Sequence, residues 1–173
     1  HSAGIDVPLQ DHEAALEVLV ELASRQHFDA VIGTDDSTLE LAAKLAASTG
    51  LQQNPPSSVR IARRKDLSRI CLHQAGIQVP DFTVINAAEK PPDDDPPFAY
   101  PCVVKPLALS GSRGVIRADS RADLDQGIQR SLKIVAQEHD IYEKSHLLLE
   151  QFVPGREFAI EGMLSDGVLE VLA

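Results

Sequence analysis

A lysine and a glycine-containing turn follow each other in residues 100–115, Tyr-Pro-Cys-Val-Val-Lys-Pro-Leu-Ala-Leu-Ser-Gly-Ser-Arg-Gly-Val. The β-branched residues before Lys105 predict a short strand that ends near the lysine, and the small residues after it predict a turn. Glycines let a backbone approach an anion closely, while N–H and hydroxyl groups donate hydrogen bonds to phosphate oxygens. An ordinary hairpin that needs glycine for its loop is the alternative. We interpret the stretch as a phosphate clamp, made of Lys105 and the turn residues Ser110, Gly111, Ser112, Arg113 and Gly114.

A second informative segment, at residues 147–161, has the sequence Leu-Leu-Leu-Glu-Gln-Phe-Val-Pro-Gly-Arg-Glu-Phe-Ala-Ile-Glu. Taken alone, Glu150 and Glu157 are typical of exposed strand carboxylates. The pairing of this segment with the Val-Val-Lys-Pro strand and its glycine turn resembles the ATP-grasp superfamily. Its members include biotin carboxylase, carbamoyl phosphate synthetase, the purine-pathway ligases, D-alanine–D-alanine ligase and the L-amino-acid ligases. The resemblance extends from about residue 28 to the end of the chain.

The resemblance implies how ATP is held at both of its ends. Glu150 would accept a hydrogen bond from the exocyclic amine of adenine. This contact would distinguish adenine from guanine, which has a carbonyl at that position. Glu157 would bind the ribose hydroxyls. Lys65 and Lys105 would neutralise the phosphates, with residues 110–114 as a lid over the γ-phosphate. The edge of the adenine ring would pair with the backbone of Gln151, Phe152 and Val153.

The lysine at position 65 lies in the run Arg-Arg-Lys-Asp-Leu-Ser-Arg at residues 63–69, which precedes Ala-Gly-Ile-Gln-Val-Pro at residues 75–80. This combination resembles the linker helix of ATP-grasp proteins, where a lysine at the helix start reaches the nucleotide phosphates. Lys65 matches that lysine, and a shift of one or two positions would put Arg64 or Arg63 in its place. The alternative is a basic, solvated helix face.

In this superfamily a carboxylate attacks the γ-phosphate of ATP, and an amine then displaces phosphate from the resulting acyl phosphate. The resemblance therefore implies an ATP-dependent carboxylate–amine ligase that uses ATP and Mg²⁺, with small carboxylate and amine substrates. We expect the Mg²⁺ ligands beyond Ala173, and we expect this N-terminal fragment to be inactive by itself. No catalytic residue is assigned. The alternatives are a subunit like carbamoyl phosphate synthetase or biotin carboxylase, and a non-catalytic nucleotide-binding module.

Composition restricts the partners of the protein. The formal net charge is −10 and aromatic residues make up 4% of the chain, with no tryptophan. A polyanion would be repelled and would find few rings to stack on, so nucleic acid is not expected as a partner. No apolar run approaches the roughly 18 residues of a membrane span. Cys71 and Cys102 lack zinc spacing, which favours reduced, buried thiols in a cytoplasmic protein. A homodimer is left open.

The order of the predicted elements indicates an α/β fold. Helical periodicity over residues 12–25 and 38–48 flanks a predicted buried strand at 28–33, which indicates a parallel open sheet. Residues 1–58 resemble a partial pre-ATP-grasp α/β domain, residues 59–98 a linker with a helix, a strand and a Pro/Asp-rich loop, and residues 99–173 an incomplete ATP-grasp nucleotide-binding domain. That last part is expected to be an α+β lobe with an antiparallel sheet, in which a second hairpin that begins at Phe158 faces the clamp.

Several local features carry further predictions. The segment Thr34-Asp35-Asp36 stands after the predicted strand, where it is either the edge of a site or the cap of the next helix. One helix is predicted over residues 60–74 and another from the cap at Ser120 to about Ala136. Residues 137–146 are predicted to form a loop, in which His139 and His146 are surface residues.

Overall fold

The computed structural model describes residues 4–87, 94–138, 140–165 and 167–173. Part of the predicted Pro/Asp-rich loop, His139 and the middle of the last predicted turn lie outside these residues. The helices are α1 (His12–Arg25), α2 (Leu39–Thr49), α3 (Pro56–Arg63), α4 (Lys65–Gln74), α5 (Arg121–Val135) and α6 (Ile141–Ser145). The strands are β1 (Phe82–Asn86), β2 (Cys102–Pro106), β3 (Ile116–Ala118), β4 (His146–Gln151), β5 (Gly162–Ser165) and β6 (Val168–Val171). None of the described helices is long and apolar enough to cross a membrane.

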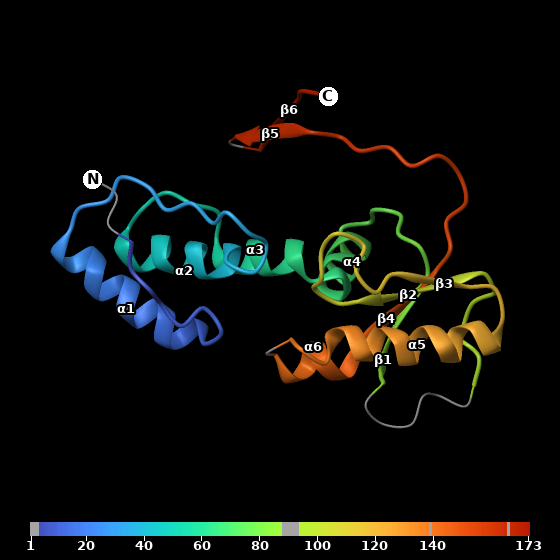
Figure 1. The fold of residues 1–173 in the computed structure, drawn as a ribbon. Helices are drawn as coiled ribbons and strands as arrows, with labels where there is room; N and C mark the ends of the chain where they lie inside the picture. The colour runs from blue at the N-terminus through green and yellow to red at the C-terminus, as the bar shows by residue number, and fades with distance from the viewer. Residues whose placement is uncertain (1–3, 88–93, 139, 166) are drawn as a thin grey trace.

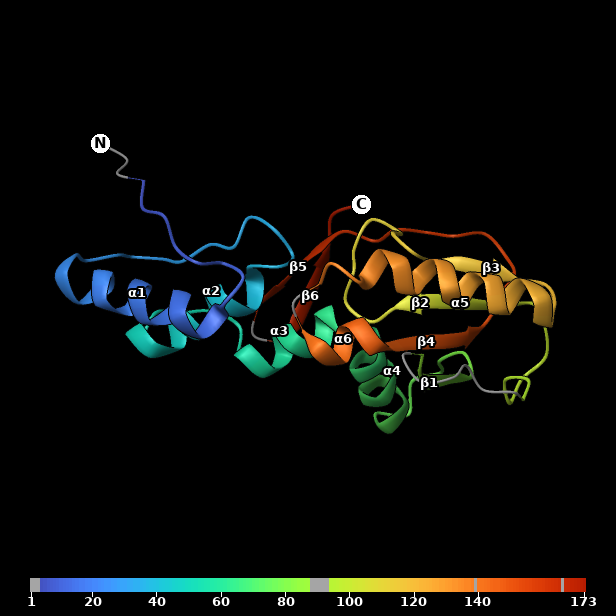
Figure 2. The same ribbon diagram turned by 60° about the horizontal axis from the view of Figure 1, so that its bottom comes forward.

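An antiparallel sheet with the strand order β1-β4-β2-β3 forms the centre of the molecule. The first strand in this order comes from the predicted linker segment. Helix α5 covers one face of the sheet and α4 lies on the opposite side (Figures 1 and 2). The predicted α/β class, with an antiparallel sheet in the second half of the chain, is confirmed.

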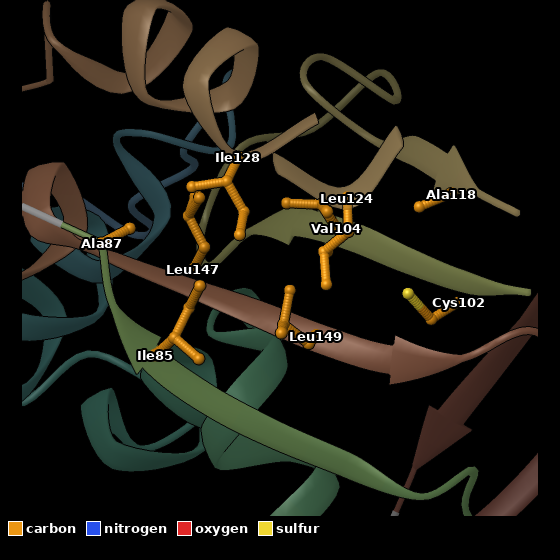
Figure 3. Packing of buried hydrophobic residues seen from close by; sticks show 9 residues of the cluster. All are labelled: Ile85, Ala87, Cys102, Val104, Ala118, Leu124, Ile128, Leu147 and Leu149. Atoms are coloured by element: carbon orange, nitrogen blue, oxygen red, sulfur yellow. The ribbon is translucent and has the colours of Figure 1, made fainter. Parts of the chain in front are cut away.

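The alternating side chains of β4 connect these two faces. Leu147 and Leu149 pack with Leu124 and Ile128 of α5 in the main hydrophobic cluster (Figure 3). Period-two alternation puts Leu148 and Glu150 on the other face, where they too are buried. The prediction of a strand buried on both faces is therefore confirmed. The strand places a buried carboxylate, that of Glu150, on the side of the sheet where α4 lies.

The phosphate clamp lies on the predicted antiparallel hairpin. Val104 of β2 pairs with Ile116 of β3, and the turn of the clamp connects these strands. Helix α5 packs behind the hairpin and begins at the predicted cap, Ser120, whose side chain accepts a hydrogen bond from the Asp123 N–H at 3.3 Å. The sheet and α5 thus hold the ends of the turn in place.

The predicted strand at residues 28–33 is not formed, and Ile32 is 80% exposed. An extended segment becomes a strand only when a neighbour satisfies its backbone N–H and C=O groups. All described strands belong to the central sheet or to the β5–β6 pair, and none pairs with residues 28–33. The prediction of a parallel sheet in this part is wrong for the described residues, where helix α2 packs against α1 and against α3.

Two further local predictions need correction. The single helix predicted over residues 60–74 is broken at Arg64, which is extended with φ −90° and ψ 110°. Residues 141–145 of the predicted loop form α6, which is capped by Asp140, whose side chain accepts from the Glu143 N–H at 2.9 Å. Of the two cysteines predicted to be buried, Cys102 is buried and Cys71 is exposed, and both thiols are free.

The last part of the chain leaves the central sheet at the end of β4. Residues 152–161 lead away from the end of β4 to the short β5–β6 hairpin. This hairpin lies apart from the four-stranded sheet (Figure 1). The first strand of this hairpin begins at Gly162 rather than at Phe158.

Candidate functional site

A cavity of about 890 Å³ lies between the helical N-terminal part and the phosphate clamp. The clamp contributes one wall, and residues from α2, α3 and the loop before α3 contribute another. Leu164 of β5 also lines it, so the second hairpin faces the clamp as predicted. The predicted site residues in its lining are Lys65, Lys105, Ser110, Gly111, Ser112 and Glu157. Those outside the lining are Arg113, Gly114, Glu150, Gln151, Phe152 and Val153.

The turn of the clamp presents backbone donors to the cavity. Gly111 and Ser112 have left-handed backbone angles, with φ of 63° and 56°. Their N–H groups donate no hydrogen bond to any residue that the structure describes. Successive N–H groups in such conformations form concave anion-binding surfaces. The turn therefore has the geometry that a phosphate group requires.

Lys65 is held at the cavity by the chain that leads into the clamp. Its backbone N–H donates to the Leu107 carbonyl at 2.9 Å, and its ammonium group donates to the Leu109 carbonyl at 2.6 Å. Burial lowers the pKa of Lys65, and the neighbouring cations Lys105, Arg63 and Arg69 lower it further. A concentration of positive charge that depresses a lysine pKa is a favourable place for an anion.

Lys105 extends from β2 on the cavity side of the sheet and forms an ion pair with Glu150 of β4. The second oxygen of that carboxylate accepts from the Arg69 side chain of α4. Burial tends to raise the pKa of Glu150, but the hydrogen bonds from Arg69 and Lys105 outweigh it and hold the pKa below its usual value. The structure thus gives the carboxylate two cationic partners, whereas the sequence resemblance assigned it to adenine.

The residues expected to meet the adenine edge have mainly structural contacts. The Gln151 N–H donates to the Asp81 carbonyl at 2.8 Å, and the Phe152 N–H donates to the Pro101 carbonyl at 3.1 Å. The Arg117 guanidinium lies 4.5 Å from the centre of the Phe152 ring. These contacts fasten the end of β4 to the neighbouring chain.

The two arginines that were alternatives to Lys65 have other surroundings. Arg64 is buried, makes a bidentate pair with Asp66 at 2.9 and 2.7 Å, and lies over the Tyr142 ring. The Arg64 side chain is thus directed into the interior at the break between α3 and α4. Arg63 lines the cavity while its guanidinium contacts Glu143 at 3.3 and 3.4 Å.

Residues 34–37, which follow the predicted strand, close a turn and also reach the cavity. The Asp35 side chain accepts from the N–H and the hydroxyl of Ser37, at 2.8 and 2.5 Å, and so closes a turn. These hydrogen bonds lower the pKa of the Asp35 carboxyl. Asp36 lines the cavity and therefore lies at the edge of the site. Neither side chain caps α2, whose first turn is preceded by Thr38 without a side-chain cap.

Sequence reasoning missed the contribution of Arg69. Its position four residues after Lys65 was a usable signal, because residues four apart lie on the same face of a helix. The polar residues Gln53, Asn54 and Ser58 also line the cavity and were not predicted. Gln53 and Asn54 stand in the connector before α3 and Ser58 in its first turn, where no motif marks them.

Acidic and other metal-ligating side chains are sparse around the cavity in the described part of the chain. Nowhere in the described part of the chain do three or more His, Cys, Asp or Glu side chains come together as a group that could hold a metal ion. The carboxylates in the lining of the cavity are those of Asp36 and Glu157.

The last glycine of the clamp is required by its position, and its replacement tests the observed turn. Gly114 has φ 74°, and an added Cβ would lie 2.7 Å from the Pro106 ring. We expect Gly114→Ala to lower the free energy of unfolding by about 2–4 kcal/mol, as the sum of backbone strain and steric overlap. Gly111→Ala is the matched control, since its φ is 63° but no atom lies within 4 Å of the added Cβ. Urea unfolding that gives equal losses for both variants would contradict this packing.

Comparisons with known proteins match this architecture. Residues 98–173 match the family model of the ATP-grasp domain. A D-alanine–D-alanine ligase from Thermotoga sp. (strain RQ2) is 29% identical over 96 residues, which are 56% of this chain and 27% of that protein. The vancomycin/teicoplanin A-type resistance protein VanA from Enterococcus faecium is 36% identical over 100 residues, 58% of this chain and 26% of that protein. The chain thus spans about a quarter of the length of these curated relatives.

A solved structure extends the likeness to nearly the whole chain. The L-amino acid ligase from Bacillus licheniformis superposes with a TM-score of 0.76 and 28% identity. The superposition covers 96% of this chain and 37% of that protein. The matched domain includes β2, the clamp and β4, which are the elements that carry Lys105 and Glu150. Residues 98–173 are therefore part of an ATP-grasp domain, and nearly the whole chain has the fold of the L-amino acid ligase.

Proposed function

We propose that this chain is the nucleotide-binding part of an ATP-dependent carboxylate–amine ligase. The observation that carries the proposal is the meeting of three segments at one cavity. Lys65 comes from α4, Lys105 from β2, and the unpartnered N–H groups of Gly111 and Ser112 from the turn between β2 and β3. Two cations and a concave set of amide donors match the triphosphate of ATP in charge and in hydrogen bonding.

In the proposed reaction these residues hold the phosphates while two substrates react in turn. A carboxylate oxygen attacks the γ-phosphorus, the bond to the bridging oxygen of ADP breaks, and an acyl phosphate forms. The amine nitrogen then attacks the acyl carbon, inorganic phosphate leaves, and the amine loses a proton. Lys65, Lys105 and the turn contribute by positioning the phosphates and by stabilising negative charge as it moves to ADP.

The relatives' names support the choice of reaction class. Two of the three are ligases of amino acids by name, which fits an attack of an amine on an activated carboxylate. Within the site, Glu157 lines the cavity and is assigned to the ribose hydroxyls. Contacts of adenine with Glu150 and residues 151–153 stay a prediction, as do the Mg²⁺ requirement, the cytoplasmic location, the division into domains and the homodimer.

The proposal is tested by calorimetric titration of the chain with ATP and with GTP, each with and without Mg²⁺. The expected result is ATP binding with a dissociation constant on the order of micromolar, about 8 kcal/mol of binding free energy, and GTP binding at least about tenfold weaker. Lack of any nucleotide binding, or equal binding of ATP and GTP, would argue against it. Ligase activity is tested in the full-length natural protein by ADP release that requires both a carboxylate and an amine.

A further inference from the structure

The contacts of Glu150 assign a function to Arg69, a residue outside the lining of the cavity. We infer that Arg69 is a positioning residue that leaves Lys105 with a net positive charge to present to phosphate. This inference rests on the proposed function, because it concerns how the same cavity binds the polyphosphate chain of a nucleotide. It adds a residue of α4 that makes no contact with the phosphates itself.

The carboxylate of Glu150 is shared between two cations that arrive from different elements. One oxygen accepts from the Arg69 Nε, and the other accepts from the Lys105 ammonium group. The Glu150 side chain is 3% exposed, whereas those of Arg69 and Lys105 are 25% and 20% exposed. The carboxylate is thus buried between the two cations.

The charges of this group sum to plus one. If Arg69 were absent, Lys105 and Glu150 would form a neutral pair, and the attraction of Lys105 for an anion would be largely cancelled at short range. With Arg69 present, one cation balances Glu150 and the other remains uncompensated. Lys105 is the member of the group that lines the cavity, so the excess charge is available at the phosphate side.

The arrangement also limits how far Glu150 can draw Lys105 away from the cavity. Arg69 occupies one carboxylate oxygen, so Lys105 is held through the other oxygen only. Without Arg69 both oxygens would be free to surround the ammonium group. Arg69 therefore acts on the position of Lys105 as well as on the net charge.

The test compares nucleotides that differ in phosphate number. Binding of ATP, ADP, AMP and adenosine is measured by calorimetry for the wild-type chain, Arg69→Met and Arg69→Lys. For Arg69→Met the expected loss of ATP affinity is about tenfold, as for one charge-assisted contact, with smaller losses for ADP and AMP and none for adenosine. Arg69→Lys restores most of the affinity, because it restores the charge. Arg130→Met, which removes an exposed cation from α5 outside the cavity lining, controls for the change in total charge.

A double variant separates charge compensation from simple support of the fold. Arg69→Met combined with Glu150→Gln removes both partners and leaves Lys105 as an uncompensated cation. Its ATP affinity relative to its adenosine affinity is expected to return to within about threefold of the wild-type ratio, because the net charge is again plus one and the comparison with adenosine cancels any change at the adenine. Equal losses for ATP and adenosine in Arg69→Met, or a further fall of the ratio of ATP to adenosine affinity in the double variant, would overturn the inference. Absence of ATP binding in the wild-type chain would instead overturn the proposed function on which it rests.

Discussion

The substitution Lys105→Met is expected to reduce ATP affinity by about 10- to 150-fold, which corresponds to about 1.5–3 kcal/mol for a hydrogen bond to a charged group. Methionine keeps the length and packing of the side chain but removes its charge. Lys105 is the cation that reaches the cavity from β2, next to the turn with unpartnered N–H groups. Adenosine affinity should be unchanged, because the loss concerns the phosphates alone.

The fold should survive this substitution, although not without cost. Glu150 keeps Arg69 as a counterion when Lys105 is removed, so no isolated charge is left in the interior. Lys133→Met, an exposed position on α5, is the control for loss of a positive charge. Calorimetry and thermal unfolding of both variants check the prediction. ATP binding by Lys105→Met that equals the wild type would refute the assignment of Lys105 to the phosphates.

The second large effect concerns stability. Glu150→Ala is expected to lower the free energy of unfolding by about 3–5 kcal/mol, as found when one member of a buried ionic group is removed. The side chain is 3% exposed, and its removal leaves Arg69 and Lys105 close together without a counterion. Urea unfolding near neutral pH measures the loss. A change of less than about 1 kcal/mol, the range of an exposed ion pair, would contradict a structural role of this group.

The same carboxylate predicts a dependence on pH, whose sign follows from its lowered pKa. Burial acts to raise the pKa of Glu150, and the hydrogen bonds of Arg69 and Lys105 bring it below the ordinary value of 4.5. Since the unfolded chain then binds the proton more readily, the contribution is fully present above about pH 4.5 and is lost as the pH falls through the folded-state pKa. Glu150→Gln should therefore lose less stability than the wild type on acidification.

Glu143 provides a control of opposite sign. Its carboxyl is buried, and burial raises its pKa above 4.5 despite the nearby Arg63. A carboxyl with a raised pKa costs stability as the pH rises from about 4.5 through its folded-state value. Glu143→Gln should remove that loss, so the two glutamine variants should change the pH profile of unfolding in opposite directions.

Local patterns of the sequence were sufficient for those elements whose causes lie within a few residues. Helix α1 begins at Asp11, whose side chain accepts from two N–H groups of the first turn at 3.1 Å, as the polar residue before an apolar stripe predicted. Gly50 and Gly76 end their helices with the positive φ angles that glycine adopts without strain. The clamp hairpin and the apolar strand β4 could also be predicted from the sequence, because the apolar run and the turn residues are local signals.

Failures occurred where the cause was distant in sequence. Residues 28–33 have the composition of a strand but no neighbouring strand, and composition contains no information about partners. The break at Arg64 results from a backbone hydrogen bond between Lys65 and Leu107 and from burial of the Arg64 side chain, both of which involve the second half of the chain. A helical periodicity that continues through residue 64 could not reveal them.

The candidate site shows the same division between features predicted from local sequence and features decided by distant contacts. Residue types, short motifs and the family resemblance predicted a phosphate site at Lys65, Lys105 and the turn, because cations and a glycine-rich backbone suit that chemistry wherever they occur. The partners of Glu150 could not be read, since Arg69 lies 81 residues away and Lys105 lies 45 residues away. Which carboxylate faces a ligand and which balances buried cations depends on the packing of α4 against the sheet, because burial and proximity in space, rather than residue type, determine where a charge finds its counterion.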